Sequence, residues 1–121
     1  MSKKLIICCD FDDTLFERGV RGYPQIGSPI MKVIQDVKHL KALGHTIILW
    51  TCRDGDPLVA AVKACADLGL EFDAVNDNLD TERHVGLSRK IYANIYIDDK
   101  AINPLYETIY ESALFNDKIK E

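Results

Sequence analysis

The chain has 121 residues, a length that suggests one domain with room for a buried core. Its formal net charge of −4 argues against broad nonspecific binding of nucleic acid, although a local basic patch would still allow it. No apolar run approaches the roughly 18 residues of a membrane-spanning helix, and Met-Ser-Lys-Lys before five apolar residues is too short for a signal peptide. We therefore expect a single cytoplasmic domain over residues 1–121 with no membrane partner.

An apolar run near the start of the chain ends in a group of acids. Residues 5–9 could fill a buried strand, and Asp10, Asp12 and Asp13 follow within four positions. Because a strand rises about 3.3 Å per residue, Asp10 and Asp12 would lie close together at its C-terminal end. Like charges at such a distance repel unless a proton or a cation lies between them. The stretch indicates a carboxyl with a raised pKa or a bound divalent ion; the structural alternative is a strand end with an Asx turn.

Apolar residues at three- and four-residue spacing predict helices. The first begins with Ser28 as N-cap and Pro29 and ends at Gly44. The second begins at Asp56-Pro57 and ends at Gly69. A third is expected from Asn103-Pro104, before a fraying tail over 116–121. The residues of this last helix that are expected to face the core are Leu105, Ile109, Ala113 and Leu114.

Further strands are predicted over residues 46–50, 72–75 and 94–97, with a loop or small hairpin over 15–27 and a loop over 76–89. Apolar strands that alternate with helices indicate an α/β fold, a parallel sheet covered on both faces. In such sheets ligands bind at the carboxyl ends of the strands. Three of the four predicted strands end in polar residues suited to a site. These residues are Asp10 and Asp12, Thr51, and Asp98 with Asp99.

The four cysteines form no CxxC pair and have no zinc-type spacing. Cys8, Cys9 and Cys65 lie in predicted buried elements, so we expect them to pack as small hydrophobic residues. Cys52 lies in a predicted loop beside the acids and is expected to be exposed.

Four motifs in this order resemble the signature motifs of the haloacid dehalogenase-like (HAD) superfamily. They are DFDDT over 10–14, Thr51 after an apolar run, Lys90, and the pair Asp98-Asp99. The resemblance implies a three-layer Rossmann-like parallel sheet with strand order 3-2-1-4. The gaps between the motifs leave no room for an inserted cap domain, so the chain looks like the small capless members found in bacterial and phage genomes.

The resemblance also implies roles for single residues. Asp10 would be the nucleophile that forms an aspartyl phosphate, and Asp12 would first protonate the leaving oxygen and then activate water. Thr51 would bind the phosphate through its hydroxyl, and Lys90 would stabilise the negative charge of Asp10 and the phosphoryl oxygens. Arg53 follows Thr51 closely and is a further candidate for substrate binding.

The same resemblance implies a Mg²⁺ site, which agrees with the preference of this ion for carboxylate oxygens. Asp10, the backbone carbonyl of Asp12, and Asp98 would hold the ion. Asp99 would act through a water molecule or orient its neighbours. Asp13 stands where many relatives have glycine and is expected to cap the turn of the flap that follows.

The resulting hypothesis is a Mg²⁺-dependent phosphomonoesterase that acts on a small phosphorylated metabolite or on an exposed phosphate of a larger substrate. One alternative is a catalytically silent HAD-like phosphate-binding or scaffold protein. Another is a signalling receiver domain, which is disfavoured because Thr51, and not a lone Asp, follows the strand over 46–50. Phosphoryl transfer to an acceptor other than water and a homo-oligomer also stay open. The open site could be covered by the flap, by residues 77–89, by a neighbouring subunit or by a large substrate.

Overall fold

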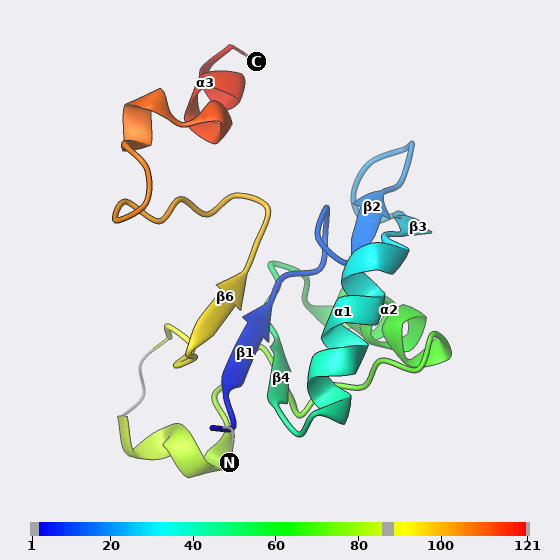
Figure 1. The fold of residues 1–121 in the computed structure, drawn as a ribbon. Coiled ribbons are helices and arrows are strands. Elements are labelled where there is room, and N and C mark those ends of the chain that lie inside the picture. The colour runs from blue at the N-terminus through cyan, green and yellow to red at the C-terminus, as the bar shows by residue number, and fades with distance from the viewer. Residues whose placement is uncertain (1–2, 86–88, 121) are drawn as a thin grey trace.

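A four-stranded parallel sheet forms the centre of the fold, with its strands in the order β5-β4-β1-β6 (Figure 1). The structure is a computed structural model that describes residues 3–85 and 89–120. The strands of this sheet are β1 (Ile6–Cys9), β4 (Thr46–Leu49), β5 (Ala74–Val75) and β6 (Ile95–Ile97). The other elements are β2 (Phe16–Arg18), β3 (Ile26–Pro29), α1 (Met31–Ala42), α2 (Gly55–Asp67), the 3₁₀ helices η1 (Asp80–Val85) and η2 (Ile109–Glu111), and α3 (Ala113–Ile119). This is the mixed α/β architecture with a parallel sheet that the sequence predicts.

The alternation of β1 divides its side chains between two apolar layers. Ile7 and Cys9 point toward α1 and α2, where they pack with Ile34 and Cys65. Cys8 points to the opposite face, where it packs with Ile48 of β4 and with the segment around Ile91. Because a central parallel strand is buried on both faces, its sequence is continuously apolar, as the run over 5–9 is. Both long helices therefore cover one face of the sheet, while an irregular segment covers the other.

The parallel strands bring their carboxyl ends to one edge of the sheet. Two ladder hydrogen bonds extend the pairing by one residue at this edge. The backbone N–H of Asp10 donates to the carbonyl of Ile97 over 2.9 Å, and that of Trp50 donates to the carbonyl of Cys9, also over 2.9 Å. The residues that follow β1, β4 and β6 are thus held next to one another by backbone bonds, independently of their own side chains.

An antiparallel hairpin of β2 and β3 follows the first strand and is the expected flap. It corrects the predicted start of the first helix, because Ser28 and Pro29 belong to β3 and Pro29 pairs with Phe16. The chain turns into α1 only after Ile30, whose N–H donates to the carbonyl of Leu15 over 2.8 Å. The cap-plus-proline pattern was misleading here because a long-range strand pairing engages the same residues.

Other boundaries shift by smaller amounts. Helix α2 begins at Gly55, before the predicted Asp56-Pro57 start, with Asp54 in extended conformation as its N-cap. Helix α1 ends before Gly44, whose φ of 96° is the left-handed conformation expected of a glycine that stops a helix. The predicted loop over 76–89 contains η1, whose polar sequence has no apolar period to reveal it.

The last predicted helix is wrong in position and in packing. Asn103 forms a local turn, since its side-chain oxygen accepts from the N–H of Leu105 and its carbonyl accepts from that of Tyr106. The helix α3 begins only after Ser112, whose hydroxyl accepts from Phe115 N–H over 3.0 Å, and it continues to Ile119 where fraying was expected. The residues expected to face the core differ in exposure: Leu105, Ile109 and Ala113 are exposed and Leu114 is half-buried. Figure 1 shows this segment standing away from the sheet.

Across residues 3–85 and 89–120 no helix combines the length and the hydropathy needed to cross a membrane.

Candidate active site

Three carboxylates meet at the carboxyl edge of the sheet. Asp10 follows β1, and Asp98 and Asp99 follow β6, the neighbouring strand. One carboxylate oxygen from each lies within 4.8 Å of the others, the spacing of a group that could hold a metal ion. Asp10 and Asp99 are half-buried and Asp98 is exposed, so the group opens to solvent on one side. The sequence pattern indicated that these acids would gather here, and the structure brings them together.

Burial is the largest cause that raises the pKa of Asp10 to about 7; Asp98 and Asp99 also act to raise this pKa, and a hydrogen bond from one backbone N–H acts to lower it. That N–H belongs to Phe11 and donates to Asp10 Oδ1 over 2.8 Å. A carboxyl in this setting is poised between its two protonation states near neutral pH. It becomes a stable carboxylate only when positive charge is placed beside it.

The pKa of Asp99 is shifted in the opposite direction. Burial acts to raise its pKa, but hydrogen bonds from Lys100 and with the carboxyl of Asp10 outweigh burial and hold the pKa of Asp99 below its ordinary value. Lys100 Nζ lies 3.0 Å from Asp99 Oδ2, whereas Asp99 Oδ1 is buried with no hydrogen-bond donor among the described residues. With the Asp10 carboxyl as neighbour, this oxygen needs a shared proton or a cation.

Asp12 and Arg53 form a buried, two-pronged ion pair. Arg53 Nε donates to Asp12 Oδ2 over 2.9 Å, and Arg53 Nη2 donates to Asp12 Oδ1 over 2.8 Å. The guanidinium lies between the rings of Phe11 and Tyr23, at 5.0 and 5.2 Å from their centroids. Its Nη1 donates to the carbonyl of Pro24 in the flap. Arg53 is only 1% exposed, so in this structure it holds Asp12 and the flap and does not reach the cavity as the sequence-based hypothesis expected.

Thr51 is fixed at the end of β4 by its own backbone and by Asn76. The N–H of Thr51 donates to Asn76 Oδ1 over 2.8 Å, and its hydroxyl accepts from Arg53 N–H over 3.2 Å. Asn76 adopts a positive φ of 54° after β5, and its Nδ2 donates to the carbonyl of Arg53. The hydroxyl of Thr51 still has a hydrogen to donate, and the side chain lines the cavity beside Asp10.

Two neighbouring cavities surround the acids. The larger one, of about 430 Å³, is lined by Asp10, Asp12, Asp98 and Thr51 together with the cations Arg18 and Lys100. The smaller one, of about 220 Å³, is lined by Asp10, Asp98 and Lys90 together with the rings of Trp50 and Tyr96. Lys90 Nζ lies 5.6 Å from the centroid of Tyr96. The structure therefore brings Lys90 to the same acids as Thr51, but from the other cavity.

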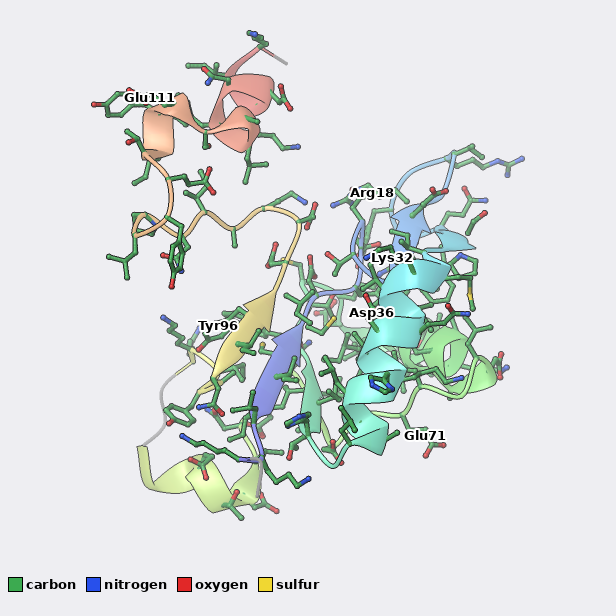
Figure 2. The ribbon with its side chains drawn as sticks, viewed as in Figure 1. Arg18, Lys32, Asp36, Glu71, Tyr96 and Glu111 are labelled. Atoms are coloured by element: carbon green, nitrogen blue, oxygen red, sulfur yellow. The ribbon has the colours of Figure 1, made fainter. Side chains whose placement is uncertain are left out.

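The turn that begins the flap depends on Asp13. Its φ is 60°, and its carboxylate accepts from both the backbone N–H and the Nε of Arg18, the latter over 2.7 Å. This confirms the predicted capping role of Asp13. It also places Arg18 at the rim of the larger cavity, on the hairpin seen in Figure 2.

Sequence reasoning missed several residues of the site. Asn76 follows a strand of the sheet, so the rule that sites lie at strand ends could have found it. Lys100 directly follows the acid pair, so its position beside Asp98 and Asp99 in the sequence could have indicated it. Trp50 and Tyr96 lie within apolar runs, where nothing distinguishes a ring that lines a cavity from one in the core.

The cysteines behave as predicted. Cys8, Cys9 and Cys65 are buried and free, and Cys52 is exposed. Burial raises the pKa of both Cys8 and Cys65 to about 12, with the charges of Asp98 and Asp10 adding to the effect at Cys8. These thiols are therefore unreactive packing residues near neutral pH.

Comparisons with known proteins place the chain beside one solved structure. No protein-family model matches the sequence, and no curated protein matches it. The fold is similar to that of a conserved protein from Bacteroides thetaiotaomicron, with 38% sequence identity and a TM-score of 0.73. The similarity covers 83% of this chain and 79% of that one. At this identity and coverage, the chain belongs to the same protein family as that Bacteroides thetaiotaomicron protein.

Proposed function

We propose that this protein is a Mg²⁺-dependent phosphomonoester hydrolase of the capless HAD type, with Asp10 as its nucleophile. The observation that carries the proposal is the group of Asp10, Asp98 and Asp99, whose oxygens lie within 4.8 Å of one another at the edge where Thr51 and Lys90 converge. The order of motifs in the sequence and the strand order β5-β4-β1-β6, which corresponds to the 3-2-1-4 order of the resemblance, support it.

The donor set fits a magnesium ion. Carboxylate oxygens with room for several waters suit this ion, and Asp99 Oδ1 is a buried acceptor that has no donor within residues 3–85 and 89–120. Asp10 and Asp98 would hold the ion with the backbone carbonyl of Asp12, and Asp99 would support them. When bound, Mg²⁺ would neutralise the acids and draw negative charge from the phosphate.

The residues of the chain then divide the reaction between them. A carboxylate oxygen of Asp10 attacks phosphorus, the bond from phosphorus to the leaving oxygen breaks, and the carboxyl of Asp12 gives that oxygen its proton. In the second step Asp12 takes a proton from water, whose oxygen attacks phosphorus and releases Asp10 and inorganic phosphate. Thr51 and Lys90 bind the phosphoryl oxygens and orient them.

The ion pair with Arg53 determines how the carboxyl of Asp12 is oriented. Each Asp12 oxygen accepts one hydrogen bond from the guanidinium, which leaves a lone pair on each that can carry the proton that Asp12 gives to the leaving oxygen and takes back from water. The pair also fixes the carboxyl against rotation. We therefore place Arg53 as a positioning residue for Asp12, and not as a phosphate ligand.

Hydrolysis of p-nitrophenyl phosphate with and without Mg²⁺ tests the proposal. We expect activity that needs the metal and that falls about 10³-fold or more in Asp10→Asn. Asp36→Asn is the matched control, because this aspartate is exposed on α1, away from the site, and its ion pair is with the exposed Lys32. Equal activity of wild type and Asp10→Asn would refute the assignment of the nucleophile. Absence of activity in both, with normal Mg²⁺ binding, would favour the silent phosphate-binding alternative.

A further inference from the structure

The two cavities at the site differ in character but share a boundary. Both are lined by Asp10, Asp98 and Trp50, so they meet at the acids. The larger cavity adds the cations Arg18 and Lys100. A phosphomonoester has the same two parts, a doubly charged group and a leaving group joined to it through one oxygen. The phosphoryl group would lie where the two cavities meet, between Thr51 of the larger one and Lys90 of the smaller one, and the leaving group would extend along the rest of the smaller cavity.

The smaller cavity has an aromatic wall. The ring centroids of Trp50 and Tyr96 lie 6.1 Å apart with the planes tilted by 52°. Both residues are partly open to solvent, at 38% and 39% exposure; Trp50 follows the central strand β4, and Tyr96 belongs to the edge strand β6. Cys8, Ile97 and Ala101 add apolar atoms to this wall, and the charged residues Asp10, Asp98 and Lys90 line the rest of the cavity. Large rings left open beside a charged site are a surface suited to stacking, since most core rings at this depth would be covered.

The ring of Tyr96 is held in place before any ligand arrives, because its hydroxyl donates to the carbonyl of Ile91. Tyr96 lies on β6, as Figure 2 shows. The backbone N–H of Trp50 donates to the carbonyl of Cys9, which fixes the place of the residue at the end of β4. Because the Tyr96 ring has little side-chain freedom left to lose, stacking against it is favoured over stacking on a mobile ring.

We propose that the smaller cavity binds a single planar aromatic ring of the leaving group, so that the substrates are phosphomonoesters with such a ring close to the ester oxygen. This inference rests on the proposed function for the reaction, but the ring-binding cavity itself does not depend on it. A volume of about 220 Å³, below the roughly 300–1,000 Å³ of most small-molecule pockets, has room for about one ring. Pyrimidine nucleosides and benzyl-type alcohols both carry such a ring.

Matched substrate pairs measure the contribution of the ring. Uridine 5′-monophosphate and ribose 5-phosphate share the reacting oxygen and differ in the base, whereas benzyl and cyclohexylmethyl phosphate differ in ring planarity. We expect wild type to prefer the aromatic member of at least one pair, and the pair preferred identifies the kind of leaving group. Trp50→Leu should lower that preference in kcat/KM by about 5- to 150-fold, the range of one lost base-aromatic stack, while Trp50→Phe should keep most of it.

The control is Tyr110→Leu, which removes an exposed ring from η2, in the segment that stands away from the sheet (Figure 1). It should leave the preference unchanged. The inference is overturned if wild type hydrolyses both substrates of each pair equally. It is also overturned if Trp50→Leu lowers kcat/KM for both substrates of a pair to the same extent, because the cavity then does not distinguish the ring.

A second readout needs neither catalytic activity nor a substitution of Trp50. Trp50 is the single tryptophan of the chain and lies where the two cavities meet, so its fluorescence reports on this site, and the matched ligands that differ only in the ring report on the ring. In Asp10→Asn, uridine or benzyl alcohol should quench it to saturation, whereas ribose and cyclohexylmethanol should not. Saturable quenching with no hydrolysis of any ester would refute the proposed function and keep the ring-binding site. Hydrolysis with no quenching and no ring preference would keep the proposed function and refute the ring-binding site.

Discussion

Replacing the candidate nucleophile should make the metal-free protein more stable at neutral and alkaline pH. Asp10 lies half-buried beside Asp98 and Asp99, and burial with these charges raises its pKa from 3.8 to about 7. Asparagine has the same shape and carries no charge. Its Oδ1 can still accept from Phe11 N–H, and its Nδ2 can donate to Asp99 Oδ1, the buried oxygen that has no donor among the described residues. Asp10→Asn therefore removes repulsion without losing a hydrogen bond.

The pKa shift sets the size and the pH range of the effect. A pKa raised from 3.8 to about 7 corresponds to about 4 kcal/mol at about 1.4 kcal/mol per unit. Since the carboxyl is partly open to solvent, screening reduces this to about 2 kcal/mol. The folded state of wild type holds the Asp10 proton more tightly than the unfolded state, so wild-type stability falls as pH rises from about 4 to about 7. The advantage of Asp10→Asn should be near zero at about pH 4 and complete by about pH 8.

Urea unfolding in EDTA across this pH range measures the difference, and a thermal melt at pH 8 should show a gain of about 8 °C at about 4 °C per kcal/mol. Asp36→Asn is the control, because its exposed pair with Lys32 is worth at most about 0.5 kcal/mol. An Asp10→Asn protein that is less stable than wild type at pH 8, or a difference that does not vary with pH, would refute this reasoning.

Three further predictions follow from the same geometry. When Mg²⁺ is added to metal-free protein at pH 8, at about 100 times its Kd, it should stabilise wild type by about 2.7 kcal/mol in a thermal melt. Asp98→Asn should lose most of that stabilisation, and an unchanged gain would show that Asp98 is not a ligand of the ion. Arg53→Met should cost about 3 kcal/mol in urea unfolding because it leaves Asp12 partly buried without its partner, and adding Asp12→Asn should recover part of the loss; no recovery would show that the ring packing of Arg53 dominates. A thiol reagent should label one cysteine of the folded protein quickly, and Cys52→Ser should abolish that phase; rapid labelling of Cys65 would contradict its burial.

The position of the acids was predictable because two local rules agree. A continuous apolar run predicts a buried parallel strand, and the residue after such a strand lies at the edge where neighbouring strands also end. Asp10 and the pair Asp98-Asp99 each satisfy both rules. The ladder hydrogen bond from Asp10 N–H to the carbonyl of Ile97 holds these acids next to one another. No knowledge of side-chain contacts was needed, since backbone geometry alone brings them together.

The C-terminal segment could not be predicted in the same way. Its apolar spacing from Leu105 is compatible with a helix, but periodicity indicates only how residues would be arranged if a helix formed and packed. The Asx turn at Asn103 and the cap at Ser112 are local hydrogen bonds that compete with a helix over the residues between them. Without tertiary contacts to reward helix formation, these local bonds decide the outcome.

Arg53 shows why residue type and spacing do not reveal what a charged side chain does. It follows Thr51 by two residues, which suggested contact with phosphate, but Asp12 and the rings of Phe11 and Tyr23 enclose it from parts of the chain 29 or more residues away. Its burial changes the charge balance of the site. Arg53 is paired to Asp12 and Lys100 is paired to Asp99, so these two cations are already engaged by carboxylates other than Asp10 and Asp98. A phosphate dianion brought to these acids would be repelled unless a cation came with it, so the burial of Arg53 supports the proposal that a divalent ion belongs to the working site.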